Sequence, residues 1–344
     1  MSELYQNNGD ISICFSADNN YVQHLSVAIV SMLSNTKTSK RINIYVLNDG
    51  SITEENKKRL EKVVMLKENA KLFFIPIDKK MFEDFYMLPK SHFTLATYYR
   101  YVIPTMLDKL SKLIYLDCDL VVCGDIEELW NTDVGSKYIA AVPDILGREN
   151  IIRLGLDSEH YCNAGVLIMN LEKMRADDIQ NELIKCTYEK RDMIRWLDQD
   201  VINMVLQNKM KYLDLSWNFQ YFYDGSKADY TKEEVRNAAK NLKIFHYIGH
   251  IKPWDYSSHR PYSHLYFKYL KMTPWKNFCY KYALYSFIKS LLFVQNEGKY
   301  RRISILGFSI KTKRKYFMLE NEIKNLKEMF IIETKNKNKV KTCN

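Results

Sequence analysis

The sequence predicts an α/β fold in which a mostly parallel central sheet is flanked by helices. Up to about residue 250, short apolar runs of strand character alternate with segments whose apolar residues recur at a helical period. This alternation is typical of βαβ units, whose strands pair in parallel. The chain has 344 residues, of which 47% are hydrophobic, and this content supports a sizeable core. We expect one large α/β domain or two smaller ones.

The first three strands are predicted within the first 76 residues. Residues 11–16 predict a strand, and the helix after it has apolar residues at a helical spacing, namely Val22, Leu25, Ile29, Met32 and Leu33. Residues 41–47 predict the second strand. The third, residues 71–75, stops at Pro76, because proline has no N–H to donate to a neighbouring strand.

Helices and strands continue to alternate in the rest of this region. The pattern from Ser51 to Glu54 resembles a capping box and predicts a helix that runs to about Lys67. The later elements, in order, are a helix over 94–104 that ends near Pro104, strands over 113–116, 138–142 and 161–170, a helix over 198–207 and a strand over 242–246.

Two carboxylates follow the apolar strand over residues 113–116. Asp117 and Asp119 are separated by one residue, and in a strand such residues point to the same face. An apolar strand that delivers acidic groups to its C-terminal end is how an open α/β sheet presents a ligand site. Two hard oxygen donors suit Mg²⁺ or Mn²⁺, which usually takes phosphate as a further ligand. The alternative is a strand that ends in an Asp-rich turn.

The turn between the first strand and its helix, residues 16–21, contains no G-x-G-x-x-G pattern, so the dinucleotide-binding fingerprint is absent. It offers Asp18 and Asn20, which can hydrogen-bond the edge of a base, and Tyr21, which can stack on its face. The alternative is that Asp18 or Asn20 caps the helix.

Composition sets the expected location. The seven cysteines are scattered and form no C-x-x-C pair, so neither a disulfide framework nor a zinc ribbon is indicated. Residues 1–10 are polar and lack the apolar region of a signal peptide. No apolar run approaches the roughly 20 residues that a membrane span needs. We therefore expect a protein of the reducing cytoplasm.

The positive charge lies at the C-terminal end. Residues 276–344 contain 16 Lys/Arg and 5 Glu, a net charge of +11, whereas the whole chain carries +10. The first 275 residues are therefore close to neutral, which argues against a basic nucleic-acid groove in the main body. We expect a catalytic domain over residues 10–275 and a basic extension over 276–344.

The extension is expected to be helical and partly amphipathic. Residues 283–294 are apolar but too short to span a bilayer, cations surround the apolar residues of 299–315, and residues 317–332 predict an amphipathic helix. Such a segment favours peripheral attachment to the anionic inner face of the cytoplasmic membrane. The alternative is a helical appendage or a self-association segment with a solvated charged face.

Five patterns occur in one order along the chain. They are Phe-Ser-Ala-Asp-Asn-Asn-Tyr at 15–21, Tyr-Leu-Asp-Cys-Asp at 115–119, Asn-Ala-Gly-Val-Leu at 163–167, Asp-Gln-Asp-x-x-Asn at 198–203 and His-x-x-Gly-x-x-Lys-Pro-Trp at 246–254. Over about residues 10–256 the chain resembles glycosyltransferase family 8, which includes bacterial lipopolysaccharide glucosyl- and galactosyltransferases. The resemblance implies a GT-A fold and retaining transfer of a hexose, glucose or galactose, from a UDP-sugar to a saccharide or glycolipid acceptor. It also implies a divalent cation, usually Mn²⁺, with Mg²⁺ as the other choice.

The resemblance further implies a role for each matching residue. The base and ribose would be bound by Ala17, Asp18, Asn20 and Tyr21. The metal would be held by Asp117, Asp119 and His246, with Cys118 contributing its backbone between the aspartates. The phosphates would be contacted by Gly249 and Lys252. The donor sugar would be surrounded by Arg100, Asn163, Ala164, Gly165, Asp198 and Gln199, and Asp144 would lie on the acceptor side.

The expected mechanism follows from the residue that faces the sugar. Retention usually uses a carboxylate nucleophile on the far face of the sugar, but here Gln199 would meet that face, and an amide is a poor nucleophile. We therefore favour a front-face mechanism, in which the acceptor hydroxyl attacks from the leaving-group side. A double displacement through Asp198 is the alternative.

Three other functional classes fit parts of the sequence. Residues 117–121 also match the Asp-x-Asp-x-Val pattern of haloacid-dehalogenase-type phosphatases, with Asp117 as nucleophile and Asp119 as acid/base. That class expects the motif on the first strand, whereas three predicted strands come before it here, and it leaves the pattern at 246–254 unexplained. A nucleotidyltransferase needs a glycine-rich loop after the first strand, and none is present. A non-catalytic subunit that binds sugar nucleotides stays open.

Overall fold

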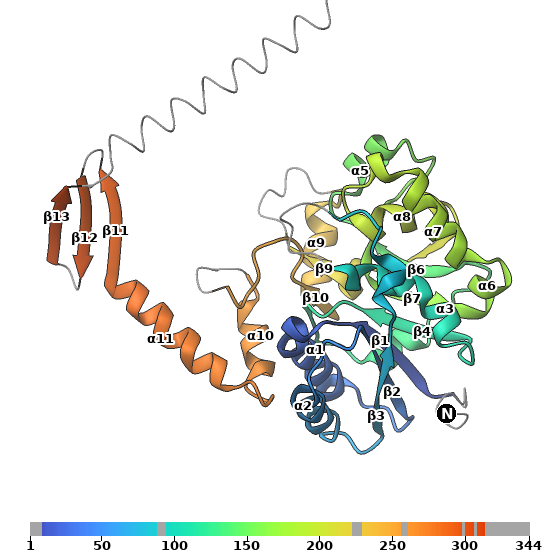
Figure 1. Cartoon of the computed structure of the whole chain (residues 1–344), viewed down its shortest axis with the longest axis horizontal. Helices are drawn as coiled ribbons and strands as arrows, with labels where there is room; N and C mark the ends of the chain where they lie inside the picture. The colour runs from blue at the N-terminus through green and yellow to red at the C-terminus, as the bar shows by residue number, and fades with distance from the viewer. Residues whose placement is uncertain are drawn as a thin grey trace, which may run out of the picture. The chain divides into compact units, whose positions relative to one another are not determined.

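The structure is a computed structural model that describes residues 9–87, 94–221, 229–255, 261–297, 300–305 and 308–313. It divides into two compact units, Met1–Cys279 and Tyr280–Asn344. The first unit contains the elements expected of the α/β domain (Figure 1).

The first unit is built on a seven-stranded sheet. Its described strands, in spatial order, are β3 (Ala70–Pro76), β2 (Ile42–Asn48), β1 (Ile11–Ser16), β4 (Lys112–Leu116), β7 (Cys162–Asn170), β6 (Ile139–Pro143) and β8 (Met210–Tyr212). The pairs β3–β2, β2–β1, β1–β4 and β6–β8 are parallel, and only β7 runs antiparallel to its neighbours. The expected mostly parallel sheet is confirmed.

A small second sheet lies next to the end of β4. It pairs β10 (Ile244–His246) with β5 (Leu120–Val122) in antiparallel and with β9 (Phe219–Gln220) in parallel. Because β5 begins four residues after β4 ends, the chain between the two sheets turns within Asp117 to Asp119.

Helices cover both faces of the main sheet (Figure 1). The described α-helices of this unit are α1 (Val22–Asn35), α2 (Glu54–Val64), α3 (Ile103–Met106), α4 (Ile126–Trp130), α5 (Gly147–Leu154), α6 (Leu171–Ala176), α7 (Ile179–Glu189), α8 (Leu197–Leu206), α9 (Lys232–Lys240) and α10 (Ser263–Leu270). Short 3₁₀ helices are η1 (Asn19–Tyr21), η2 (Lys79–Phe82), η3 (Leu95–Val102), η4 (Arg191–Met193) and η5 (Leu215–Asn218).

The continuous apolar run of β1 is explained by burial on both faces. Ile13 and Phe15 pack in a core that includes α1, α2 and α10, whereas Cys14, between them, packs in a second core with η3, α7 and α8. Strands buried in this way lack the alternation of polar and apolar residues that one-sided sheets show.

Two predicted helix ends are wrong. The helix after β2 starts at Glu54 with Thr53 as its N-cap, whose hydroxyl accepts from the N–H of Asn56, so Ser51 is not the capping residue. The segment that was expected to end near Pro104 is the 3₁₀ helix η3 followed by α3, which starts at Ile103. Pro104 lies in the first turn of α3, where a missing N–H leaves no hydrogen bond unmade.

The described part of the C-terminal region is only partly helical. Helix α11 (Asn277–Leu291) matches the expectation, but β11 (Leu292–Glu297), β12 (Tyr300–Ile305) and β13 (Phe308–Lys313) form an antiparallel sheet, so a wholly helical extension is wrong. Residues 308–313 alternate between Phe, Ile or Thr and Ser or Lys, a period of two that is typical of a strand. The amphipathic helix expected over 317–332 lies outside the described residues. Within the described ranges, no helix combines the length and apolar character needed to cross a membrane.

Candidate active site

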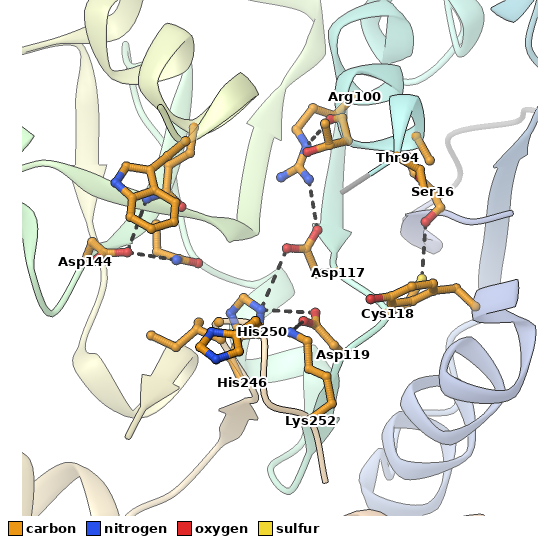
Figure 2. A pocket seen from close by; sticks show the side chains of 18 of the residues that line it. Ser16, Thr94, Arg100, Asp117, Cys118, Asp119, Asp144, His246, His250 and Lys252 are labelled. Carbon is orange, nitrogen blue, oxygen red and sulfur yellow. Dashed lines mark hydrogen bonds and ion pairs between the residues drawn. The ribbon is translucent and has the colours of Figure 1, made fainter. Parts of the chain in front are cut away.

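A cavity of about 630 Å³ opens where β1 and β4 end (Figure 2). Thirteen residues singled out from the sequence line it, namely Ala17, Asp18, Tyr21, Arg100, Asp117, Cys118, Asp119, Asp144, Asn163, Gln199, His246, Gly249 and Lys252. Among the described residues, four that were expected there are not part of its lining, namely Asn20, Ala164, Gly165 and Asp198.

Asp117, Asp119 and His246 form a cluster with the composition of a metal site. One ligand atom from each lies within 4.8 Å of the others. His246 Nε2 is 3.2 Å from Asp119 Oδ1 and 3.8 Å from Asp117 Oδ2. Two carboxylates and an imidazole suit a divalent cation, and the imidazole favours Mn²⁺ over Mg²⁺.

The two aspartates come together for a different reason from the one expected. Strand β4 ends at Leu116, so Asp117 and Asp119 belong to the turn into β5 rather than to a strand. The antiparallel pairing of β5 with β10 places His246 opposite Leu120, next to Asp119. The small second sheet therefore closes the cluster.

Gly165 lies behind the cluster and has no side chain for a steric reason. A Cβ on this residue would lie 2.3 Å from His246 Cε1 and 2.8 Å from Asp117 Oδ2. Atoms at these distances overlap, so any larger residue would displace two of the three cluster residues. Gly165 is not part of the cavity lining, and its expected contact with the donor sugar stays a prediction.

Lys252 contacts the oxygen of Asp119 that His246 does not face. Its ammonium contacts Asp119 Oδ2 and lies 2.7 Å from the backbone oxygen of Tyr247. Burial would raise the pKa of Asp119, but the Lys252 ammonium and His246 outweigh burial and lower that pKa well below its usual range. The carboxylate is therefore ionised, as cation binding requires.

Arg100 is buried between two carboxylates. Its Nη2 donates to Asp117 Oδ1 and its Nε lies near Asp198 Oδ2, both at 2.9 Å, and Nη1 donates to the backbone oxygen of Ala164. Figure 2 shows Arg100 and His246 on opposite sides of Asp117. The guanidinium therefore fixes the orientation of this carboxylate in the cluster.

Asp198 is buried under Arg100 and its two oxygens are engaged. Oδ2 pairs with Arg100, and Oδ1 accepts from the Thr97 hydroxyl. Burial raises the pKa of Asp198 to about 6, and Arg100 and Thr97 oppose this rise. A carboxylate in this position pairs with Arg100 and is not part of the cavity lining.

Gln199 and Asn163 both contact Asp144, which lies across the pocket from Arg100 in Figure 2. Gln199 Oε1 accepts from the N–H of Ala164 at 3.1 Å, and its Nε2 lies 3.3 Å from Asp144 Oδ2. Asn163 Nδ2 donates to the same oxygen at 2.9 Å. Burial raises the pKa of Asp144, and these donors oppose the rise. Ala164 therefore contributes its backbone N–H and C=O to the site.

In the turn after β1, Asp18 both caps a helix and lines the cavity, the two roles expected as alternatives. Its Oδ1 accepts from the N–H groups of Asn20 and Tyr21 at 2.9 and 3.1 Å, so Asp18 caps η1 while it also lines the cavity. Asn20 is exposed and is not part of the cavity lining, and its expected contact with a base stays a prediction. Tyr21 is in edge contact with Trp254.

Trp254 anchors the segment that carries Gly249 and Lys252. Its ring stacks on His24 of α1, with centroids 3.5 Å apart, and His24 hydrogen-bonds the hydroxyl of Tyr266 at 2.7 Å. Burial lowers the pKa of His24 to about 3, so this imidazole is neutral. In the Lys-Pro-Trp part of the sequence pattern, Trp254 therefore packs against α1, and Lys252 contacts Asp119.

Several lining residues were missed by sequence reasoning. Trp196, which is 47% exposed, lines the cavity with Glu149, Arg153 and Arg195, at the side of Gln199. An exposed indole is a common platform for a sugar ring, since it presents a flat apolar face. No spacing or pattern in the sequence marks these residues, because α5 and the start of α8 come together only in the fold.

The family model described as "Glycosyl transferase family 8" matches residues 12–258. The chain is 33% identical over 268 residues to general stress protein A of Bacillus subtilis (strain 168), covering 75% of this chain and 92% of that protein. It is 28% identical to lipopolysaccharide glucosyltransferase WaaO of Escherichia coli (strain K12), covering 78% of this chain and 79% of that protein.

The fold has a counterpart among solved structures. The galactosyltransferase LgtC, solved in complex with donor and acceptor sugar analogs, superposes with a TM-score of 0.68 at 26% identity, covering 77% of this chain and 96% of that chain. The arrangement of the first unit is therefore the GT-A fold. With a match over most of the chain and these relatives, the protein belongs to glycosyltransferase family 8.

Proposed function

We propose that this glycosyltransferase retains the anomeric configuration while it moves glucose or galactose from a UDP-sugar to a saccharide or glycolipid acceptor, in the presence of Mn²⁺. The observation that carries this proposal is the cluster of Asp117, Asp119 and His246 in the wall of a cavity large enough for a sugar nucleotide. Such a cation would neutralise charge on the diphosphate and promote departure of UDP. Lipopolysaccharide or another surface glycan is the proposed product class, in line with the relatives' names.

Different residues of the cavity would bind different parts of the UDP-sugar donor. Tyr21 and Asp18 would bind uracil and ribose, next to the cluster. Lys252, beside Asp119, would donate to the leaving phosphate and stabilise its growing charge. Gln199 and Asn163 would contact the sugar, and Trp196 would receive the acceptor at the same end of the cavity.

The burial of Asp198 favours the front-face mechanism over a double displacement. Both of its oxygens are engaged by Arg100 and Thr97, whereas Gln199 lines the cavity. The acceptor oxygen would bond to the anomeric carbon on the side from which UDP leaves, as the bond from that carbon to the phosphate oxygen breaks. The acceptor's proton would pass to a phosphate oxygen of the leaving UDP.

The test of the proposed function is a screen of UDP-sugars with Mn²⁺, scored by release of UDP with and without a saccharide acceptor. UDP-glucose or UDP-galactose is expected to be consumed, and chelation by EDTA to stop the reaction. Hydrolysis of p-nitrophenyl phosphate without turnover of any UDP-sugar would contradict the proposal.

Replacing Gln199 with alanine is expected to lower kcat roughly 10- to 100-fold while the affinity for UDP changes little. The side chain would touch only the sugar, and loss of a hydrogen-bonding group in the transition state lowers kcat by about this amount. The matched control is Gln207→Ala, because Gln207 ends the same helix and accepts from the N–H of Asp157 instead. A glycosyl adduct on Asp198, detected by mass spectrometry, would contradict the front-face mechanism.

We further propose that residues 276–344 attach the enzyme to the anionic inner face of the cytoplasmic membrane. The net charge of +11 in this region supports the proposal, since each basic residue near such a surface contributes about 1 kcal/mol. The attachment would bring the active site to a lipid-linked acceptor.

Deleting residues 280–344, which follow the compact first unit, is expected to release the protein from anionic vesicles and to leave UDP-sugar hydrolysis largely unchanged. The full chain should also detach as salt rises, because charge attraction is screened within roughly 8 Å at physiological ionic strength. Vesicle flotation measures both effects, with neutral vesicles as the control. Equal flotation with anionic and neutral vesicles would contradict the membrane role.

A further inference from the structure

Asn218 is a fully buried amide that contacts the metal cluster from behind. It ends η5, its side chain has no exposed surface, and it is not a lining residue of the cavity. Its Oδ1 lies 3.0 Å from His246 Nδ1, and its Nδ2 lies 2.9 Å from Asn163 Oδ1. Asn218 therefore links a cluster residue to an amide beside Asp144.

The orientation of the Asn163 amide is fixed by one neighbour that can only donate a hydrogen bond and one that acts as an acceptor. The backbone N–H of Gly165 can only donate, and it lies 2.9 Å from Asn163 Oδ1. On the other side, Asp144 Oδ2 lies 2.9 Å from Asn163 Nδ2. Asp144 also receives the N–H of Leu146, so its oxygens act as acceptors. Asn163 must point its oxygen toward Gly165 and Asn218.

The orientation of Asn218 follows from that of Asn163. The atom that faces Asn163 Oδ1 has to be a donor, so it is the amide nitrogen of Asn218. The amide oxygen of Asn218 then faces His246 Nδ1, and an oxygen can only accept. Nδ1 must therefore carry a proton, which leaves Nε2, on the side of Asp119 and Asp117, as the nitrogen available to a cation.

We infer that Asn218 is a positioning residue that sets the tautomer of His246 for metal binding. The Gly165 N–H, which can only donate, fixes the orientation of the Asn163 amide. Asn163 in turn fixes the orientation of the Asn218 amide, and Asn218 determines which nitrogen of the imidazole is protonated. The same Asp144 oxygen that holds Asn163 also lies next to Gln199. The chain of hydrogen bonds thus joins the residue that would bind the cation to the residue that would contact the sugar.

This inference rests on the proposed metal-dependent function, but its first test does not. Selective ¹⁵N labelling of histidine in the metal-free protein shows by NMR whether Nδ1 carries a proton, and a His246→Asn variant assigns the signals. A protonated Nδ1 is expected for His246 in the wild type, because the Asn218 oxygen that faces it can only accept. An Nδ1 without a proton would overturn the inference, whatever the enzyme's activity.

The second test compares the Mn²⁺ affinity of variants by calorimetry in the presence of UDP. Asn218→Leu, which has a similar shape and no acceptor, should lose 10- to 100-fold, the usual effect of removing such a partner of a metal ligand. Asn218→Asp keeps an acceptor for Nδ1–H but loses the donor to Asn163 Oδ1, so it should lose less Mn²⁺ affinity than Asn218→Leu. Asn43→Leu is the matched control, because Asn43 is a buried amide that donates to Asp10.

The outcomes separate the inference from the proposed function. If the wild type binds no Mn²⁺ with UDP, the proposed function fails, while the NMR result still decides the tautomer. If the wild type binds Mn²⁺ and Asn218→Leu binds it equally well, the positioning role is wrong. An equal loss in Asn218→Leu and Asn43→Leu would show general destabilisation and would also contradict the role.

Discussion

Replacing Asp119 with alanine is expected to abolish Mn²⁺-dependent sugar transfer, with a loss of at least roughly 10³-fold in kcat/KM. Asp119 is 3.2 Å from His246 Nε2 and lies in contact with the Lys252 ammonium. Its removal takes away one of three groups that would hold the cation. It also leaves the buried Lys252 without its carboxylate partner.

The second effect requires a companion variant. Asp119→Asn keeps the shape of the side chain and an oxygen for Lys252, but it removes the negative charge that holds a divalent cation. The expected result is a similar loss of transfer with less loss of thermal stability than in Asp119→Ala. Asp177→Ala, which removes a carboxylate paired with Lys173 at the surface, is the control and should stay active. Activity that EDTA does not affect would contradict the metal assignment for the whole cluster.

The parts of the site that were predicted correctly depend on neighbours in sequence. Asp117 and Asp119 follow a buried apolar strand within three residues, so their joint direction could be expected even though the turn, and not the strand, supplies it. His246 was a candidate because it ends a late strand. Its place beside Asp119 depends on the pairing of β5 with β10, and a three-residue strand such as β5 has almost no signal of its own.

The parts that were missed depend on contacts between distant segments. The sequence around Arg100 predicted a helix. Nothing in that local sequence indicates that the Arg100 guanidinium would pair with Asp198 and Asp117. Asn218 follows a tryptophan in a short 3₁₀ helix and carries no pattern. In the extension, the polar positions of β13 are mostly lysines, so its two-residue period is short and lies within a basic region. A helical extension was expected, whereas strands form there.

Replacing Gly165 with alanine is expected to weaken Mn²⁺ binding by roughly 10- to 100-fold and to destabilise the protein by about 1–3 kcal/mol. The added methyl group would lie 2.3 Å from His246 Cε1, so something must move. The strand cannot easily retreat, because the N–H of Gly165 donates to Asn163 and its C=O accepts from the N–H of Asp117 at 2.8 Å. The cluster residues must move instead.

A steric clash could lower the stability of the fold without changing Mn²⁺ affinity. A substitution at a second glycine, Gly124, distinguishes general destabilisation from a specific effect on the metal site. A Cβ on Gly124 would lie 2.5 Å from Lys243 Cδ, so Gly124→Ala also introduces a steric clash, but away from the cluster and against a flexible side chain. It should change stability with little effect on Mn²⁺ affinity, as measured by calorimetry and thermal unfolding. In Gly165→Ala, by contrast, the clash falls on an imidazole held by Asn218 and on a carboxylate held by Arg100. If both variants bind Mn²⁺ as tightly as the wild type, Gly165 does not shape the metal site, because the cluster can then tolerate a displacement that its hydrogen bonds should resist.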